Sequence, residues 1–365
     1  MTKNHTPSMY KAVNMVPNPS ELLALFKQNL PSAIFEAIVE KINAETKQRI
    51  SEYYASLIEG NEGDSAALVH WKYDSSLARE IPKYLAYRLY AVKEAEAGDL
   101  LFAEELDQFF VSASATAGQV CGFCSLAVDD SSAEYCLCSG GCGSAYCSQV
   151  CMQQAQENYH RFFCAKQQEI GALGVFGVFV AKYIAMMLSE ELKGNSAHRK
   201  GPFMHYEFLA KVPIQREQSA QASSEAAVVR SVLSPVNAGM DEFLTDERYL
   251  TMHATLRHNA FATSHHSGEP KLRWCNNEGS NESVVCLLTA LVHIEHSCTP
   301  NAEIVLDLAA RKANLVAIRS IAKDECITVS WLSPHDLASE DRHSILMNSF
   351  FLLCNCGDCA NKKSN

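Results

Sequence analysis

The stretch 121–164 reads CGFC (121–124), CLCSGGC (136–142), YCSQVC (146–151) and HRFFC (160–164). Tetrahedral zinc takes four thiolate or imidazole donors, and residues two to four apart can bring two side chains to one ion. His160 and Cys164 are four residues apart, so on a helix they share one face and reach the same metal. The donor count fits two zinc ions. Because such closed sites leave no position for a catalytic water, we expect these ions to hold the fold together.

A second cysteine group lies near the C-terminus, where EHSCTPN (295–301) and KDECITVSW (323–331) precede SFFLLCNCGDC (349–359). Cys354, Cys356 and Cys359 supply three thiolates, one short of a tetrahedral site. Cys298 is the natural fourth donor. The sequence therefore predicts three zinc ions per chain.

The composition limits the class of partner. The 365 residues are enough for two or three domains, and 47% hydrophobic with 20% charged residues is typical of a globular protein. Lys and Arg total 31 against 42 Asp and Glu, a formal net charge of −11. That balance argues against direct nucleic-acid binding, and it favours a protein or peptide partner.

Cysteine usage and hydropathy bear on the compartment. Fifteen cysteines, an odd number gathered in short-spaced pairs, favour metal binding over disulfides. The start MTKNH lacks the apolar region of a secretory signal. We therefore expect an intracellular protein of the cytoplasm, the nucleus or both. The apolar run 170–188 contains Lys182, which is costly at the centre of a bilayer, so we expect a buried helix and no membrane contact.

The segment 121–164 resembles a MYND-type zinc finger. The resemblance implies interleaved ligand pairs, with one zinc ion on Cys121, Cys124, Cys147 and Cys151 and the other on Cys138, Cys142, His160 and Cys164. CSGGC spaces its cysteines by one residue more than the family does. Cys136 therefore stays open as a substitute for Cys138.

The C-terminal motifs resemble a SET domain with its post-SET zinc site, and LYAVKEAEAGDLLFAEE (89–105) resembles the opening SET hairpin. A MYND finger between the two is typical of the SET and MYND domain family of protein-lysine methyltransferases. The implied fold is α+β, a SET β-fold split by the finger and by a helical insert. The expected parts are a helical N-terminal extension (1–80), a first SET part (81–120), the finger (121–164), a helical insert with an exposed polar loop at 215–227 (165–258), the core SET domain (259–340) and a post-SET zinc segment (341–365).

The resemblance implies methyl transfer from S-adenosylmethionine to a lysine amine inside a narrow channel. Such an in-line displacement needs a deprotonated amine, alignment and exclusion of water. His296 and Asn259 match cofactor-binding positions of the family. Tyr206, Tyr249 and His258 lie in segments that could line the same pocket.

Five positions depart from the family pattern. Ala86 and Arg88 replace the two glycines of the cofactor turn, where side chains would crowd the cofactor. Glu295 replaces the motif Asn, exchanging an amide for an acceptor-only carboxylate. Trp331 and Phe350 align with the two channel tyrosines, and neither has a phenol.

Two hypotheses follow from this pattern. The first is a diverged S-adenosylmethionine-dependent protein-lysine methyltransferase, acting on histone or non-histone lysines. The second is a catalytically inactive SET and MYND scaffold that binds protein partners, since the departures fall where the cofactor turn and the channel are built while the zinc ligands are kept.

Overall fold

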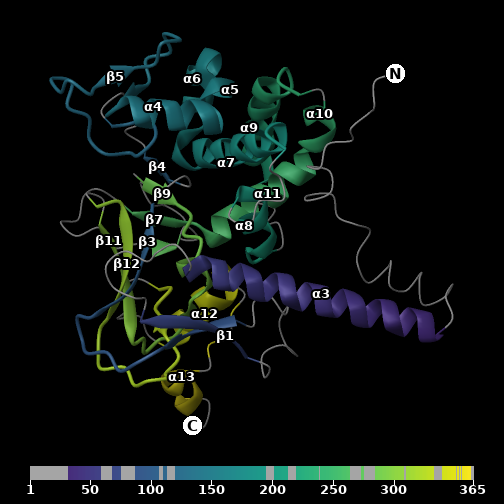
Figure 1. The fold of residues 1–365 in the computed structure, drawn as a ribbon, viewed down its shortest axis with the longest axis vertical. Helices are drawn as coiled ribbons and strands as arrows, with labels where there is room; N and C mark the ends of the chain where they lie inside the picture. Colours follow the sequence, from purple (N-terminus) through teal and green to yellow (C-terminus); the bar gives the residue numbers. More distant parts are fainter. Residues whose placement is uncertain are drawn as a thin grey trace.

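The computed structural model describes residues 32–58, 68–74, 87–106, 110–112, 120–194, 201–212, 219–237, 239–263, 273–274, 284–307, 310–332, 339–350, 352, 354 and 356–362. They form a mixed α and β architecture, as the sequence predicted. Helices gather at one end of the molecule, and the longer strands lie at the other (Figure 1). Ala86, one of the two turn positions of interest, lies outside the described residues.

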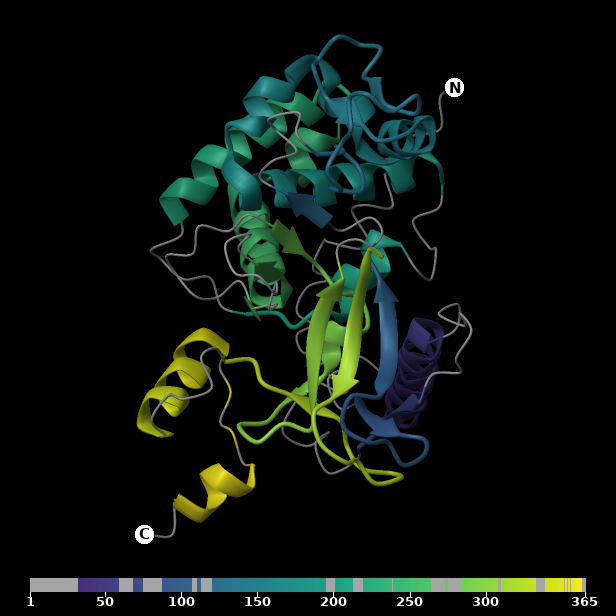
Figure 2. The same ribbon diagram turned by 90° about the vertical axis from the view of Figure 1, so that its left-hand side faces the viewer.

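The main sheet has three antiparallel strands in the order β11 (Ala302–Asp307), β12 (Lys312–Ala317) and β3 (Leu100–Glu105). Figure 2 shows them side by side. Burial alternates along β12, which is the period-two pattern of a strand with one face on the core. Before β3 the chain turns at Gly98, whose φ of 94° lies in the region that glycine tolerates. The predicted Gly-Asp turn is therefore present.

Two further sheets have shorter strands. The strands β1 (Val69–Tyr73) and β2 (Tyr87–Ala91) pair antiparallel, and a four-stranded sheet has the order β4 (Phe110–Ser112), β9 (Val284–Cys286), β7 (Phe261–Thr263) and β8 (Arg273–Trp274). Strand β9 ends at Cys286. A 3₁₀ turn, η7 (Leu291–His293), follows it, because the buried Glu104 carboxylate accepts the backbone N–H groups of Thr289, Ala290 and Leu291 and so holds the start of that turn.

A short parallel pair marks the crossing of two distant segments. β10 (Glu295–His296) lies beside β13 (Thr328–Val329). The buried Asn301 side chain fastens this crossing, since its amide donates to the Glu325 carboxylate at 2.9 Å and to the Cys326 carbonyl at 2.8 Å and accepts from the Thr328 N–H at 2.8 Å. EHSCTPN is thereby held against the strand that follows KDEC.

The helical end is built around α7 (Gly174–Leu192), which is buried over most of its length. Around it lie α4 (Gln149–Ala155), η4 (Gln156–His160), α5 (Arg161–Phe163), η5 (Cys164–Lys166), α6 (Gln167–Gly171), α8 (Pro202–Phe208), α9 (Ser219–Leu233), α10 (Met240–Phe243) and α11 (Asp246–Asn259). The expected buried helix in 170–188 is confirmed. Within the described residues, no helix is both long and apolar enough to cross a bilayer.

The prediction of an exposed polar loop at 215–227 is wrong from Ser219 onward. Helix α9 begins there, and Ala222, Ala226 and Val229 are fully buried. These small residues recur at three- and four-residue spacing, so one face of a polar-looking segment packs on the other helices. Residues 215–218 lie outside the described part of the chain.

The N-terminal helix α3 (Ser32–Ile58) packs on the sheets with its C-terminal half. Ile50, Tyr53, Tyr54 and Leu57 form its buried face, and the Tyr54 ring stacks on Tyr87 with centroids 4.3 Å apart. The other end of α3 projects away from the body (Figure 1). At the opposite terminus, Cys354 and Cys356 lie between α12 (Ser339–Phe350) and α13 (Gly357–Lys362), and Cys359 lies within α13.

Candidate functional site

Three groups of cysteine and histidine side chains converge within the described residues. They are Cys121, Cys124, Cys147 and Cys151; Cys138, Cys142, His160 and Cys164; and Cys298, Cys354, Cys356 and Cys359. In each group the four ligand atoms lie within 4.8 Å of one another. The three groups are the sets expected from the sequence, with Cys138 rather than Cys136 in the second.

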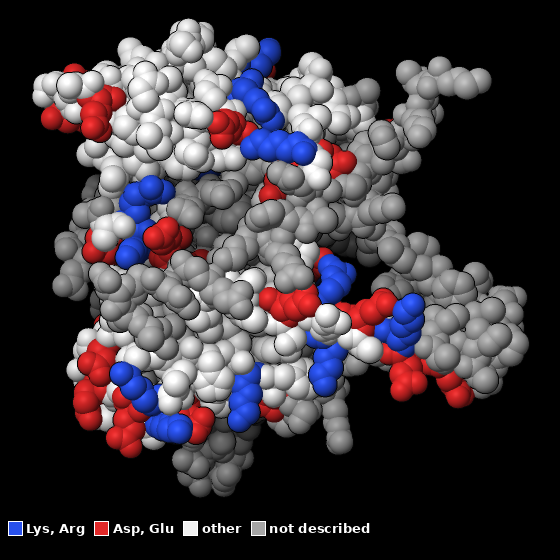
Figure 3. Space-filling model, viewed as in Figure 1, with Lys and Arg blue, Asp and Glu red and all other residues white. Residues whose placement is uncertain are grey.

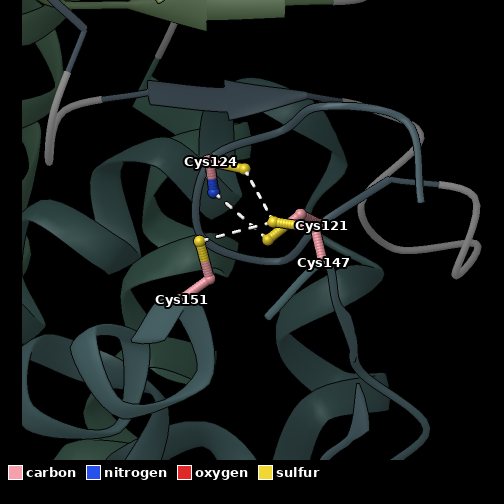
Figure 4. Close-up of side chains that lie close together, drawn as sticks. All are labelled: Cys121, Cys124, Cys147 and Cys151. Atoms are coloured by element: carbon pink, nitrogen blue, oxygen red, sulfur yellow. Dashed lines mark hydrogen bonds between the residues drawn. The ribbon is translucent and has the colours of Figure 1, made fainter. Parts of the chain in front are cut away.

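The first group is drawn in Figure 4. Cys121 and Cys124 come from one tight turn, Cys147 follows β6 (Ala145–Tyr146), and Cys151 lies in the first turn of α4, where the Ser148 side chain caps the helix by accepting the Cys151 N–H. The Sγ atoms of Cys124 and Cys147 are 3.5 Å apart, as are those of Cys147 and Cys151. Four sulfurs bound to one zinc ion at about 2.3 Å lie about 3.8 Å apart, so this spacing fits a tetrahedral site.

The second group depends on the two glycines of CSGGC. The Cys138 and Cys164 Sγ atoms are 3.5 Å apart, and His160 Nε2 lies 3.2 Å from Cys138 Sγ and 3.3 Å from Cys142 Sγ. A Cβ at Gly140 would clash with Cys164 Sγ, and Gly141 has a positive φ of 74°. The extra residue of this motif is therefore accommodated by a glycine turn. Burial lowers the pKa of His160 to about 4, which keeps the imidazole neutral at pH 7 and able to bind a metal.

The third group joins segments far apart in the sequence. The Cys298 Sγ lies 3.8 Å from that of Cys354 and 3.6 Å from that of Cys359. The Cys356 N–H points to Cys354 Sγ at 3.5 Å, as in a metal-binding turn. All three groups thus offer the thiolate and imidazole donors that zinc prefers, at tetrahedral spacing.

His296, a predicted cofactor residue, uses both ring nitrogens within the protein. Its Nδ1 accepts the Trp331 backbone N–H at 3.0 Å, so in the neutral ring the proton sits on Nε2. Nε2 lies 3.4 Å from Cys298 Sγ. Burial and, to a smaller extent, the charge of Arg342 lower the pKa of His296 to about 4. The His296 side chain therefore contacts a thiol of the third metal-ligand group, as groups around a metal site commonly do.

Glu295 and Arg88, two of the five departures from the family, bind each other. Arg88 Nη2 lies 2.5 Å from Glu295 Oε1, and Arg88 Nη1 lies 3.5 Å from Asp74 Oδ2. The Cys326 thiol contacts the other Glu295 oxygen at 3.9 Å. Burial raises the pKa of Glu295, and the Arg88 charge opposes that rise. An ion pair formed by two side chains of the chain itself therefore stands at the predicted cofactor position.

The side chain of Asn259 also makes its hydrogen bonds within the protein. Its side-chain amide donates to the carbonyls of Ala210 at 2.9 Å and Thr255 at 2.7 Å, and its oxygen accepts the Ala210 N–H at 3.2 Å. The residue is buried at the end of α11. It ties this helix to the segment after α8.

The two positions aligned with channel tyrosines form an aromatic contact. The Trp331 ring centroid lies 5.4 Å from that of Phe350 and 5.7 Å from that of His296. The Trp331 indole N–H donates to the Ile294 carbonyl at 3.1 Å. The side chains at these positions thus pack on one another and on the EHSC segment.

Of the three other pocket candidates, only His258 lies near these rings, with its centroid 6.1 Å from that of Phe350. The Tyr249 hydroxyl instead donates to Glu225 at 3.1 Å in the helical end. Tyr206 is buried under Lys211. The sequence analysis missed the pairing of Arg88 with Glu295, although their opposite charges are a signal for it.

The surface charges are mixed. On the face in Figure 3, Lys and Arg side chains are interspersed with Asp and Glu and form no extended area of one sign. The described residues of this face therefore form no basic patch of the kind that a nucleic-acid interface uses.

Comparisons with known proteins give one partial sequence match. The chain is 36% identical over 77 residues to the SET domain and MYND-type zinc finger protein 6 of Schizosaccharomyces pombe, strain 972. The match covers 21% of this chain and 15% of that protein's length. A family model described as MAS20 protein import receptor matches residues 4–55. A crystal structure of "the SET domain of LSMT bound to Lysine and AdoHcy" aligns with a TM-score of 0.37 and 10% identity, over 79% of this chain and 54% of that one.

Proposed function

We propose that this SET and MYND-like chain is a zinc-clamped scaffold that binds protein partners and does not transfer methyl groups. It keeps the metal-binding frame of a methyltransferase-type protein, with the SET fold split by the finger and the helical insert. The observation that carries the proposal is the Arg88–Glu295 ion pair at the predicted cofactor position.

The ion pair opposes cofactor binding in two ways. The Arg88 side chain fills space that the family leaves open with glycine, beside backbone that must approach the cofactor. S-adenosylmethionine would also have to break the pair or bind beside it. Breaking a partly buried ion pair leaves one charge without its partner, and that cost is subtracted from any binding energy.

The channel positions oppose transfer as well. Methyl transfer needs the lysine amine aligned with the sulfonium methyl group. Trp331 provides a single N–H donor, which is already bound to the Ile294 carbonyl, and Phe350 provides no polar atom. Neither side chain can replace the missing phenols as an acceptor for the amine.

The alternative is a diverged, active protein-lysine methyltransferase. It is favoured by the intact crossing of β10 and β13, fastened by Asn301, because this crossing belongs to the resemblance that implies the cofactor pocket. In that case an ion pair would have to open when S-adenosylmethionine binds. The two hypotheses differ in a measurable affinity.

Calorimetric titration with S-adenosylmethionine and with S-adenosylhomocysteine tests the proposal. The scaffold predicts dissociation constants weaker than about 1 mM, or a binding free energy smaller than about 4 kcal/mol. The double variant R88G/E295N removes both departures and should bind more tightly than the native chain. The charge-swapped variant R88E/E295R keeps an ion pair and serves as the matched control.

Micromolar binding to the native chain, lost in H296A, would contradict the scaffold proposal and favour the enzyme. Incubation with labelled S-adenosylmethionine and histone or non-histone proteins then gives the direct readout of transfer. For the scaffold, the net charge of −11 favours basic protein partners, and the thiol-rich sites suit a reducing compartment such as cytoplasm or nucleus.

A further inference from the structure

Lys182 is a buried cation in the middle of the apolar helix α7. It is only 4% exposed, and apolar residues of α7 surround it along the chain. Burying an ammonium group is costly unless a negative charge or a π system compensates for the lost water. The position of Lys182 therefore implies a compensating aromatic ring or negative charge close by.

The contacts of Lys182 lead to the first metal-ligand group. Its Nζ lies 4.5 Å from the centroid of the Tyr159 ring, a cation–π distance. The Tyr159 hydroxyl donates to the Gly122 carbonyl at 2.5 Å. Gly122 lies between Cys121 and Cys124, so the aromatic ring links the ammonium group to the CGFC turn.

A second cation approaches the same turn. The guanidinium of Arg311, which precedes β12, lies 5.9 Å from the centroid of the Phe123 ring. The pKa of Lys182 is lowered to about 7, chiefly by burial and also by the Arg311 charge, while negative charge on Cys121 and Cys124 opposes this fall. Two cations that repel each other near CGFC are stabilised if that turn carries negative charge.

The metal centre would provide that charge. Four thiolates around one Zn²⁺ leave a net charge of about −2, and in this group Cys121 and Cys124 are buried. We propose that Lys182 is the counter-charge of the Cys121–Cys124–Cys147–Cys151 zinc centre and raises its affinity for zinc. Lys182 is thus a positioning residue from the helical end of the molecule, and its role does not depend on whether the chain transfers methyl groups.

The second group has a different environment. One of its donors is the neutral His160, so three thiolates around Zn²⁺ leave a net charge of about −1. The Gly140 N–H and the Gln156 side-chain amide lie 3.4 and 3.6 Å from Cys138 Sγ. The second group, with the smaller net charge, is therefore contacted by neutral donors. The first group, with the larger net charge, has the cation of Lys182 nearby.

The test is zinc retention by the full zinc-loaded chain in competition with a chromophoric chelator. In K182M, which keeps the length of the side chain and removes its charge, one zinc equivalent should be lost about 10–100-fold more readily, the range found for groups around a metal site. K182R keeps the charge and should retain zinc nearly as the native chain does. K193M, at the exposed end of the same helix, is the surface control.

A purely structural Lys182 predicts another result. Replacing a buried ammonium with a thioether removes a desolvation cost, so K182M would be at least as stable and would keep its zinc. Unchanged zinc retention in K182M would overturn the proposal. If K182M folds poorly, excess zinc during refolding should restore it, because higher metal concentration offsets weaker binding. Failure of zinc to restore folding would also overturn the proposal.

A double-mutant cycle tests whether charge is the cause. C151H exchanges one thiolate for a neutral imidazole, so the net charge of the zinc centre changes from about −2 to about −1. The effect of K182M on zinc retention should then be smaller in C151H than in the native chain. An equal effect in both backgrounds would contradict an electrostatic role.

Discussion

The metal-ligand groups and the predicted cofactor region of this chain differ in the contacts that their polar atoms make. In the metal-ligand groups, twelve donors converge at the spacing of a tetrahedral ion. In the cofactor region, His296, Glu295 and Asn259 direct their polar atoms to neighbouring protein groups. A binding site needs groups that stay available for the ligand. The difference supports the proposed scaffold, in which the three groups bind zinc and the predicted cofactor positions serve internal contacts.

The largest expected effect is that of metal removal. Structural zinc in small domains contributes about 10–16 kcal/mol of apparent binding free energy at pH 7, so the chain without zinc should lose the structure of 121–164 and of the C-terminal segment. Elemental analysis of the native protein should give close to three zinc ions per chain. Hydrogen exchange before and after chelation would locate the loss. A zinc content near one ion per chain would contradict the view that all three metal-ligand groups bind zinc.

Substitution of Gly140 should produce the next largest effect. In Gly140→Ala the new Cβ clashes with Cys164 Sγ, so the second group cannot close around an ion without moving its backbone. We expect loss of one zinc equivalent and a lower melting temperature. Gly357→Ala is the matched control, since a Cβ there meets no atom within 4 Å. Three zinc ions in Gly140→Ala would show that this turn is more adaptable than its geometry indicates.

The sequence predicted the metal-ligand groups well because their donors come in short-spaced pairs. Two cysteines within a few residues are fixed relative to each other by a single turn, as in CGFC. The buried helix around Lys182 and the turn at Gly98 were predictable for the same reason, since each depends on local spacing.

What the sequence did not predict depends on contacts between distant segments. Arg88 and Glu295 were each interpreted against a family pattern, and only the fold brings them to 2.5 Å. The contact of the predicted cofactor residue His296 with the backbone of Trp331 likewise joins distant segments. The Ser-, Gln- and Ala-rich composition of 219–227 predicts a loop where the structure has helix α9. Its buried stripe of Ala222, Ala226, Val229 and Leu233 was the local signal that could have revealed it.

A smaller effect is expected at Glu190, near the C-terminal end of helix α7. Burial raises its pKa to about 7, and its Oε2 has no hydrogen-bond partner. Because the pKa is higher in the folded than in the unfolded chain, stability should be full below about pH 4.5 and fall as the pH rises to 7. Glu190→Gln should flatten this fall between about pH 4.5 and 7, by less than about 1 kcal/mol because the group keeps contact with water. Thermal melts of both proteins at each pH measure the difference, and identical pH slopes would contradict the assignment.

The smallest expected effect distinguishes Cys136 from Cys138, which the spacing of CLCSGGC alone could not separate. Cys138 Sγ lies within hydrogen-bonding distance of His160 and of Cys164, whereas Cys136 pairs through its backbone with Tyr146 in the hairpin of β5 (Cys136–Leu137) and β6. Cys136→Ser should therefore leave the zinc content and the melting temperature unchanged, while Cys138→Ser should lose one equivalent. The reverse result would mean that Cys136, and not Cys138, binds the ion. For this the strand would have to shift by two residues, which would break the pairing of Leu137 with Ala145. The hairpin pairing of Leu137 with Ala145, and the buried position of Ala145, make that shift unfavourable.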